Sequence, residues 1–292
     1  MSVETLTGPV ETLTEPIETV AGPVSARKRI PIGRIGRLLG RAIWKSAAIG
    51  LFALLWEFGP KYLLDPSTRV FLPPLHKDLQ AWWHLAQSGA LQDHLQASLS
   101  RSAVGFGLAI LAAVPLGLLI AWYRPVADFL NPLLELFRNT AALALLPVFT
   151  LLLGIGETSK IAIVTYAAFF PVLLNTIAGV KTVDPLLIRA ARTLGLDSPR
   201  MFAKVILPAA VPTIFSGIRM AGAASILVLI AAEMAGAKAG LGYLITNDQN
   251  SFLYPEMYAG ILTIAGLGLV INLVLVRLER HFSRWRTASA SR

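Results

Sequence analysis

The chain has 292 residues, of which 55% are hydrophobic and only 15% are charged, and its formal net charge is +9. Soluble domains carry about 25% charged residues, so this composition excludes an ordinary soluble globule and indicates an integral membrane protein. The sequence has no cysteine, which excludes disulfides, thiolate metal sites and cysteine nucleophiles, and its four histidines form no H-E-x-x-H zinc motif.

The amino-terminal segment is repetitive. Residues 3–23 consist of three seven-residue units, VETLTGP, VETLTEP and IETVAGP, each closed by a proline. Proline stops a helix from propagating, and three short units have too little apolar surface to form a core. We therefore expect residues 1–26 to be a disordered acidic tail, with an interaction arm as the alternative.

A basic segment at 27–45 precedes the first apolar stretch. Lysine and arginine gather on the cytoplasmic side of membrane proteins, so this segment predicts an amino terminus inside the cell. The basic residues flank apolar stretches and are not interleaved with stacking aromatic residues, which argues against nucleic acid as a partner. They are Arg27, Lys28, Arg29, Arg34, Arg37, Arg41 and Lys45.

Six apolar stretches approach the ~20 residues that a helix needs to cross the ~30 Å hydrocarbon core of a bilayer. The predicted fold is therefore an all-α integral membrane protein with about six transmembrane helices. From an inside start, six spans also place the loop at 181–208 and the tail at 281–292 in the cytoplasm, and both are basic. The spans are predicted at 46–64, 97–122, 129–153, 159–180, 209–233 and 256–277.

The segment between the first two spans, 65–94, combines a proline-containing start with an amphipathic pattern around Trp82 and Trp83. We expect an outer-surface element there, whose paired tryptophans either lie at the membrane interface or pack against neighbouring residues. The first span and this loop make up one segment, 46–94, and the remaining spans form a core domain at 95–280.

The third span contains Pro132 and Pro147 together with Glu135, Arg138 and Asn139, so it is not a plain lipid-facing helix. A charged side chain at the centre of a membrane helix costs about 2.5 to 3.5 kcal/mol on insertion scales, so such residues usually face a polar cavity and are functional candidates. Glu135 and Arg138 are three residues apart, a spacing at which opposite charges readily pair, and the alternative is that Arg138 guides an anion.

Later spans hold three more candidates for a polar path, namely Asn175, Ser225 and Glu233. For Asn175 and Ser225, a hydrogen bond from one helix to another is the commoner role and remains the alternative. The stretch AGLGYLI, with Gly240 and Gly242, predicts a tight turn into a short outer helix. A lone G-x-G of this kind is weak evidence for phosphate binding.

The loop at 181–208 is a polar island between two apolar spans. Asp184-Pro185 predicts a helix start, because aspartate accepts from free amides and proline suits the first helical position. Gly195 stands where a left-handed residue ends a helix. Asp197-Ser198-Pro199 repeats the start signal, and we expect Pro208 to end the second helix. The two helices are predicted to present Leu194, Met201 and Phe202 to a partner protein, with arginines at the rim.

The spacing within this loop resembles the signature loop of permease subunits of bacterial ATP-binding-cassette importers, E-A-A, three residues, G, nine residues, I, one residue, L-P. Here it reads Arg189-Ala190-Ala191, Gly195, Val205 and Leu207-Pro208, with every interval matching and arginine in place of the usual glutamate. Further stretches, LPVFTLLLGIGETSK, FFPVLLNTIAGV and IAAEMAGAKAGLGYLI, resemble permeases for nitrate, taurine and, most closely in texture, aliphatic sulfonates. Where this subfamily often has prolines after the third-span arginine, the chain has Asn139-Thr140-Ala141-Ala142.

The resemblance implies the type I importer permease fold and a set of partners. These are ATP-binding-cassette ATPase subunits, a second permease copy expected to form a homodimer with this one, an external solute-binding protein and membrane lipid, in the bacterial inner membrane. The chain has no G-x-x-x-x-G-K-[ST] loop, so we expect no catalysis, cofactor or metal, and ATP hydrolysis by a partner. The residues implied to couple to the ATPase are Arg189, Ala190, Ala191, Leu194, Gly195, Met201, Phe202, Val205, Leu207 and Pro208.

Two other classes remain as alternatives. A self-sufficient secondary transporter would also use proline-broken helices and buried charges, but it does not account for the capped two-helix loop. An integral-membrane enzyme would need a nucleophile with its base or a metal cluster at membrane depth, and the sequence offers neither.

Overall fold

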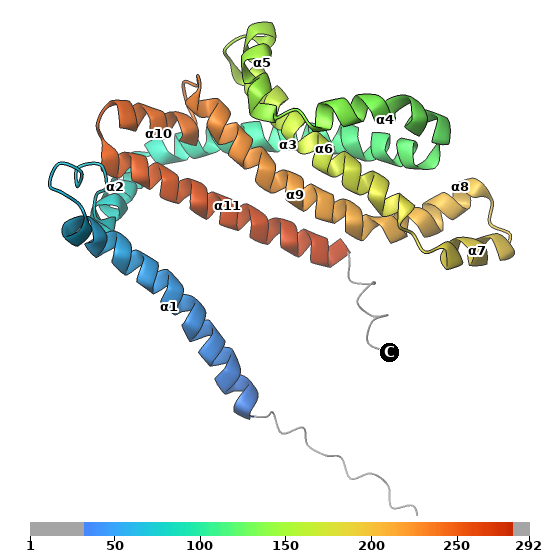
Figure 1. Ribbon diagram of the computed structural model, residues 1–292, viewed down its shortest axis with the longest axis horizontal. Helices are drawn as coiled ribbons and strands as arrows, with labels where there is room; N and C mark the ends of the chain where they lie inside the picture. The colour runs from blue at the N-terminus through green and yellow to red at the C-terminus, as the bar shows by residue number, and fades with distance from the viewer. Residues whose placement is uncertain (1–31, 283–292) are drawn as a thin grey trace, which may run out of the picture. The chain divides into compact units, whose positions relative to one another are not determined.

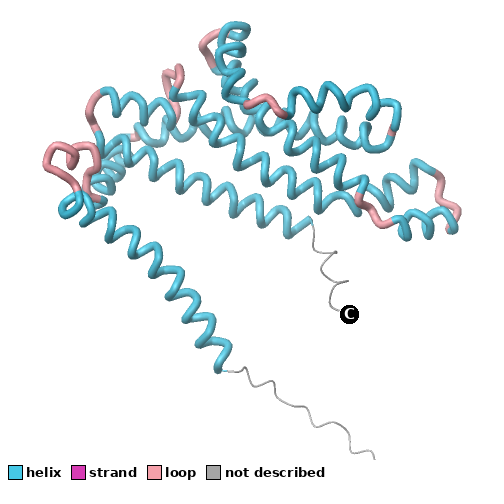
Figure 2. Tube along the Cα trace, viewed as in Figure 1, coloured by secondary structure: helices cyan, strands magenta, loops and turns pink. Residues whose placement is uncertain are grey.

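The computed structural model describes the backbone of residues 32–282 and the side chains from residue 47 onward, apart from residue 63. The predicted acidic tail 1–26 and most of the tail 281–292 lie outside the described residues, as does the first part of the basic segment. Within 32–282 the chain forms helices, turns and loops and no strand, as Figure 2 shows. The prediction of an all-α fold is confirmed.

The chain divides into two units, residues 1–52 and 53–292. The described part of the first unit is the beginning of α1 (Ile32–Leu63). The second unit contains the end of α1 and all other elements: α2 (Leu75–Ser88), α3 (Ala90–Trp122), α4 (Arg124–Arg138), η1 (Ala142–Leu145), α5 (Leu146–Leu153), α6 (Glu157–Lys181), α7 (Pro185–Thr193), α8 (Ser198–Met201), η2 (Phe202–Ile206), α9 (Leu207–Met234), α10 (Leu241–Asn250) and α11 (Tyr254–Phe282).

Among the described residues, four helices are long and apolar enough to cross a membrane, or five if the bent pair α4 and η1–α5 counts as one span. The span expected at 46–64 falls in α1, whose side chains are described only from residue 47, so this sixth span stays a prediction.

Three long helices, α3, α6 and α9, form the core of the second unit and pack against one another along their lengths (Figure 1). On α3 the residues facing α6 recur every four positions and are all small: Gly105, Ala109, Ala113 and Gly117. A Cβ on Gly105 would lie 2.8 Å from the Val164 side chain. The small residues let the helix backbones approach closely, which is how membrane helices gain packing energy where lipid is as apolar as leucine.

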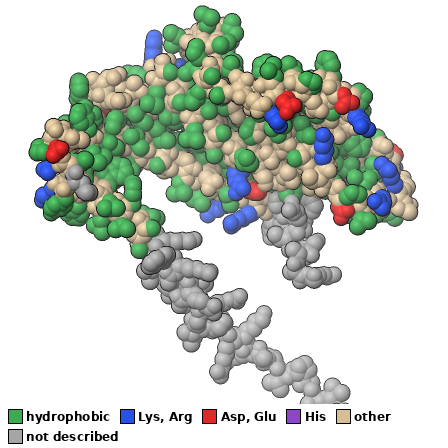
Figure 3. All heavy atoms as spheres, viewed as in Figure 1, with side chains coloured by type: hydrophobic (Ala, Val, Ile, Leu, Met, Phe, Trp, Pro, Cys, Tyr) green, Lys and Arg blue, Asp and Glu red, His purple; other side chains and the backbone are tan. Residues whose placement is uncertain are grey.

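The core helices give the second unit two ends. The end that carries α7 and α8 is called the loop end here, and the end that carries α2 and α10 is called the α10 end (Figure 1). Apolar side chains cover most of the face shown in Figure 3, while lysines and arginines gather near the loop end. Exposed apolar residues along the helices, such as Leu111, Leu151 and Leu227, fit a surface that contacts lipid.

The predicted amphipathic helix in 65–94 is α2, and its two tryptophans have separate roles. The Trp82 indole donates to the Thr263 hydroxyl on α11 at 3.1 Å, so Trp82 packs within the protein. Trp83 is exposed. Packing against neighbouring residues is therefore confirmed for Trp82, and a place at the membrane interface stays a prediction for Trp83.

Candidate functional site

The two-helix loop, residues 181–208, begins as its sequence predicts. The Asp184 carboxylate accepts a hydrogen bond from the Leu186 amide at 2.8 Å, and Pro185 occupies the first helical position of α7. The helix ends at Gly195, whose φ of 76° is left-handed, and the Leu196 amide then donates back to the Ala191 carbonyl at 3.1 Å. Glycine adopts this conformation without the steric cost that a Cβ brings, so the predicted hinge geometry is confirmed.

The second half of the loop differs from the prediction. Asp197 makes no side-chain hydrogen bond to the start of α8, although its backbone carbonyl accepts from the Met201 amide at 2.8 Å. Pro208 does not end the second helix. Instead α8 passes through a π turn at Phe202–Ile206 into α9, and Pro208 lies in the first turn of α9, where its missing N–H costs little.

Side-chain exposure corrects the predicted docking surface. Leu194 is 79% exposed, together with Leu186 and Leu187, whereas Met201 is only 5% exposed. Met201 lies in an apolar cluster within the protein, and the Phe202 ring packs edge-on against Trp122 with ring centroids 4.7 Å apart. These two side chains therefore face the interior of the protein. The exposed apolar surface of the loop is formed by leucines of α7 and its end.

The other residues of the signature also divide between surface and interior. Arg189 and Ala190 are exposed and Ala191 is buried, while Val205, Leu207 and Pro208 are half-buried. Within residues 47–282, neither Arg189 nor Arg192 has a carboxylate within 4.0 Å. The loop therefore presents a leucine surface bordered by arginines that form no ion pair inside the described chain.

The predicted break in the third span is present, as a bend of 87° between α4 and the η1–α5 segment. At the bend, an Arg138 guanidinium nitrogen lies 3.0 Å from a Glu135 carboxylate oxygen, so the predicted pairing occurs. Both side chains are exposed on the isolated chain. The pairing does not exclude anion guidance, because an exposed guanidinium keeps donors free for another acceptor.

A cavity of about 500 Å³ opens beside this break, between α6 and α9 at about half their length. Its polar lining brings together Arg138, Asn139, Thr140, Tyr166 and Asn175. Asn175 donates to the Pro171 carbonyl one turn earlier in its own helix, at 2.8 Å, and not to another helix. Three of the predicted path residues thus line one cavity, which is called the broken-span cavity here.

Ser225 and Glu233 do not join the broken-span cavity. Ser225 is buried and donates to the Gly222 carbonyl of its own helix at 2.9 Å. The helix-to-helix hydrogen bond considered for Asn175 and Ser225 is therefore absent in both cases from the bonds of the described residues.

Glu233 instead lies at the α10 end and is 1% exposed. Its carboxylate accepts hydrogen bonds from the Ser98 hydroxyl at 2.8 and 2.9 Å, from Arg101 Nη1 at 2.7 Å and from the Gly242 amide at 3.0 Å. Arg101 also binds the Glu157 carboxylate through Nε and Nη2. This cluster of Ser98, Arg101, Glu157 and Glu233, of which Glu157 is exposed and the other three are buried, joins α3, α6 and α9 and is called the Arg101 cluster here.

Sequence reasoning missed Arg101 and Glu157. Arg101 lies inside the predicted span 97–122, and an ionisable residue in a span is itself a sign of function or of a buried partner. That signal was available. The identity of its partners was not, because they lie 56 and 132 residues away in the sequence.

The turn between α9 and α10 is built around the same cluster. The predicted tight turn into a short helix is confirmed, with φ of 123° at Gly240 followed by α10. A Cβ on Gly240 would lie 2.4 Å from the Glu233 carboxylate, and one on Gly242 would lie 2.3 Å from the Ile230 carbonyl oxygen. The two glycines allow the backbone to close over the buried glutamate.

Two further carboxylates are buried at the α10 end. Asp78 on α2 is wholly buried, and desolvation raises its pKa to about 7, against opposing effects of Trp56 and His76. His76 in turn contacts Glu57, with 2.7 Å between Nδ1 and Oε1. Burial likewise raises the pKa of Asp248 on α10. A carboxyl whose pKa lies near 7 changes its charge in the physiological range.

Comparison with curated proteins finds relatives along most of the chain. The taurine transport system permease protein of Escherichia coli (strain K12) is 34% identical over 249 residues, which cover 82% of this chain and 90% of the relative. A putative aliphatic sulfonates transport permease protein of Bacillus subtilis (strain 168) is 36% identical, with coverage of 70% and 74%. The nitrate import permease protein of Leptolyngbya laminosa is 30% identical, with coverage of 85% and 91%.

Solved structures of ABC transporters share the fold of this chain at low sequence identity. The MetNI methionine ABC transporter in an inward-facing conformation matches with a TM-score of 0.58 and 18% identity, covering 68% of this chain and 98% of that chain. An amino acid ABC transporter matches with a TM-score of 0.55 and 19% identity, with coverage of 69% and 96%. The predicted type I importer permease fold is confirmed.

A family model matches residues 113–287, which contain the broken span, the two-helix loop and the turn between α9 and α10. Together with the relatives above 30% identity, this match confirms the resemblance seen in the loop. The chain belongs to the family of binding-protein-dependent transport system inner membrane components, and it is a permease subunit of an ATP-binding-cassette importer.

Proposed function

We propose that this permease carries a small organic or inorganic oxyanion, with aliphatic sulfonates, taurine and nitrate as the substrate class. The observation that supports this most directly is the broken-span cavity. It combines one guanidinium with amide and hydroxyl groups on a mostly apolar wall, and Arg138 is the only lysine or arginine among its lining residues in the described chain. A planar guanidinium can donate two parallel hydrogen bonds to the oxygens of such an anion.

The position of the cavity fits a path across the membrane. It lies half-way along α6 and α9, beside the bend at which α4 gives way to η1 and α5. Importers and other transporters place substrate near the middle of the bilayer, where discontinuous helices expose polar backbone to a cavity and not to lipid. The Glu135 carboxylate at 3.0 Å holds Arg138 at the mouth until an anion competes for the guanidinium.

The two-helix loop would pass movement of the ATPase to this path. α8, η2 and α9 form one continuous helical segment, Ser198–Met234, so a displacement of α8 is carried directly into α9. α7 is separated from α6 by Thr182–Asp184, which makes that side of the loop a joint. ATP-driven closure of the ATPase subunits would therefore tilt α9 more directly than α6.

The remaining assembly follows the family. ATPase subunits and a solute-binding protein are the partners that the family implies. We propose that two identical copies of this chain enclose the path between their broken-span cavities, with lipid around the apolar faces. The basic residues at the loop end favour a cytoplasmic loop and cytoplasmic termini. Arg138, Asn139 and Asn175 are the proposed path residues, and Leu194 is the centre of the proposed ATPase contact.

The test is uptake by the reconstituted transporter. The permease, its ATPase and its solute-binding protein are placed in proteoliposomes, and ATP-dependent uptake of labelled taurine, ethanesulfonate and nitrate is measured. We expect uptake of at least one of these anions. We expect Arg138→Ala to lower uptake about tenfold or more, with the ATPase still bound, since loss of a charged hydrogen-bond donor costs about 1.5 to 3 kcal/mol.

The Glu135 carboxylate provides the matched comparison. If Arg138 acts on the anion, Glu135→Ala keeps uptake or raises it, and the double variant behaves like Arg138→Ala. If the double variant is no worse than either single variant and all three are mild, the two residues act mainly as a structural pair. Transport by the purified chain alone in ATP-free vesicles would instead establish a secondary transporter.

A further inference from the structure

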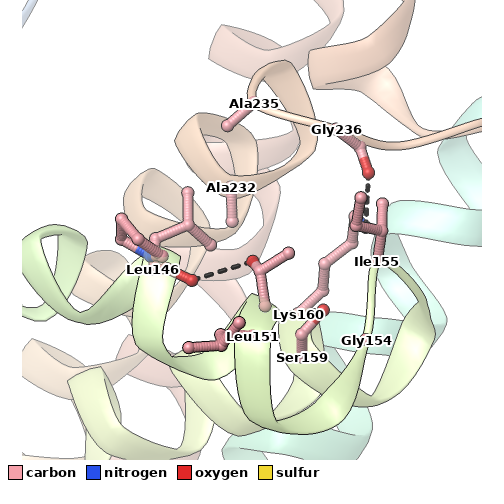
Figure 4. Close-up of a pocket in the computed structure, with 11 residues that line it drawn as sticks. Leu146, Leu151, Gly154, Ile155, Ser159, Lys160, Ala232, Ala235 and Gly236 are labelled. Atoms are coloured by element: carbon pink, nitrogen blue, oxygen red, sulfur yellow. Dashed lines mark hydrogen bonds between the residues drawn. The ribbon is translucent and has the colours of Figure 1, made fainter.

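A second cavity, of about 570 Å³, lies at the α10 end (Figure 4). It is enclosed by α5, the beginning of α6 and the end of α9, and it shares no lining residue with the broken-span cavity. Its wall is mostly apolar, with Leu146, Leu151 and Ile155 among the residues drawn. Its size is in the range of small-molecule sites, which are typically apolar with a few placed polar groups.

The polar group of interest in this wall is Lys160, which is 4% exposed. Its ammonium donates to the Gly156 carbonyl at 3.1 Å and to the Gly236 carbonyl at 2.9 Å, as the dashed line to Gly236 in Figure 4 indicates. An ammonium has three hydrogens, so two carbonyl bonds leave one donor direction. Within the described chain, no carboxylate lies within 4.0 Å of Lys160.

Lys160 lacks an acidic partner although two glutamates belong to the adjacent Arg101 cluster. Glu157 lies one turn before Lys160, and Glu233 lies on α9, but Arg101 binds both carboxylates. A buried cation with neutral acceptors alone is costly, since desolvation is not repaid by a counter-charge. The first turn of α6 has no side-chain cap, and its one acidic side chain, Glu157, is bound by Arg101.

We propose that this cavity is a second anion site, in which Lys160 binds the oxygens of a small sulfonate head before the solute moves on to Arg138. The proposal rests on the proposed transport of oxyanions and adds an entry site to it. Both cavities lie along α6, with Lys160 near its start and Tyr166 to Asn175 further on. At the α10 end the positive charge of Lys160 would bind the anion first. In the broken-span cavity Arg138 would then supply the positive charge.

Because the chain has no cysteine, one introduced thiol can report the local charge. Ala235 lines the cavity and is exposed, so Ala235→Cys offers a thiol beside Gly236. In the assembled transporter, in nanodiscs of phosphatidylcholine, this thiol reacts with 2-sulfonatoethyl or with 2-(trimethylammonio)ethyl methanethiosulfonate. Each reaction forms a mixed disulfide and releases methanesulfinate, and the two reagents differ chiefly in charge.

We expect the ratio of anionic to cationic labelling rates to fall about tenfold when Lys160→Met is added, and to persist with Lys160→Arg. Ser251→Cys, an exposed position outside the cavity, should show no such dependence. Ethanesulfonate should slow labelling of Ala235→Cys while the uncharged ethyl methyl sulfone does not. This last measurement uses the native Lys160 and so remains decisive if Lys160→Met does not fold.

Equal ratios with Lys160 and Lys160→Met, or equal effects of ethanesulfonate and the sulfone, would overturn the proposal. Protection by phosphatidylglycerol in the nanodisc without protection by ethanesulfonate would assign the cavity to a lipid headgroup and would also overturn it. Labelling requires no uptake. A failure here therefore leaves the uptake assay of the proposed function unaffected, and a failed uptake assay does not alter the labelling result.

Discussion

The two ends of the second unit satisfy their charges in different ways. At the α10 end, Arg101 and Glu233 are almost wholly buried and bind each other, and glycine backbone closes over them. At the loop end, Arg189 and Arg192 are exposed without a carboxylate in the described chain, and Leu194 beside them is exposed too. The Arg101–Glu233 pair is completed within the chain, whereas the loop end has the composition of a surface that another protein covers.

This difference indicates where stability and function reside. Removing Arg101 or Glu233 at the α10 end should destabilise the permease itself, since a buried charge would lose its partner. Removing an exposed side chain at the loop end should leave the permease folded and weaken its assembly with the ATPase. The experiments below test this division.

The largest effect is expected from Arg101→Met, which leaves Glu233 buried without a counter-charge. We expect a loss of about 3 to 5 kcal/mol in the free energy of unfolding, measured by thermal or denaturant unfolding in detergent. Arg138→Met is the matched control, because it removes an exposed pair that contributes about 0 to 1 kcal/mol. Equal losses of unfolding free energy for both variants would show that the Arg101 cluster does not stabilise the α10 end.

The next largest effect on stability is expected from the wholly buried Asp78, also at the α10 end. Its pKa of about 7 lies above the ordinary value of 3.8, so the folded chain keeps a proton that the unfolded chain has released. The contribution of Asp78 to stability is therefore complete below about pH 4 and is lost as pH rises from about 4 to about 7, by about 2 to 3 kcal/mol between pH 5 and pH 8. Asp78→Asn should remove most of this dependence in unfolding curves. An unchanged pH profile would contradict the assignment to Asp78.

At the loop end, Leu194→Ser should weaken the complex with the ATPase and leave the permease folded. Covering an exposed leucine contributes about 2 kcal/mol, so we expect about a thirtyfold loss of affinity, measured as ATPase retained on the purified permease. Met201→Ala is the contrasting variant, because Met201 is buried: it should lower stability first. If Met201→Ala releases the ATPase from a folded permease while Leu194→Ser does not, the docking surface includes Met201, as the sequence predicts, and does not depend on Leu194.

The smallest effect on stability is expected at the hinge between the two helices. Gly195→Val places a β-branched residue at φ of 76°, at a cost of about 1 to 2 kcal/mol. We expect the complex to persist but ATP hydrolysis to proceed with less uptake per ATP. Gly195→Asn tolerates this conformation and should keep the coupling ratio near that of the native protein. Full coupling in Gly195→Val would exclude a role for this hinge.

Local features of the loop could be predicted from the sequence because each depends on few neighbouring residues. Asp184 caps α7 and Gly195 ends it, since a carboxylate two residues from an amide and a glycine without a Cβ need no tertiary contact to act. Pro208 was misread for the same reason. A proline that ends a helix and a proline in the first turn of the next helix look alike until the π turn before it is known.

The packing and the buried charges depend on distant residues, and the sequence does not pair them. The small residues of α3 recur every four positions, but which helix they face became visible only against Val164 on α6. Glu233 was predicted to line the polar path, yet it is bound by Arg101 and does not line the broken-span cavity. Lys160 lies within a predicted span, and its lack of a carboxylate partner is a property of three helices together.

The direction in which the two-helix loop faces depends on the π turn at Phe202–Ile206, where one residue more or less would rotate α8 relative to α9. An α-helix advances by about 100° per residue, so deleting one residue in this turn would restore regular winding and rotate α8 about the axis of α9 by roughly that angle. The insertion of one codon at this place would have the opposite effect. A permease of this kind can thus be refitted to a different ATPase surface without any change to the helices that enclose its path.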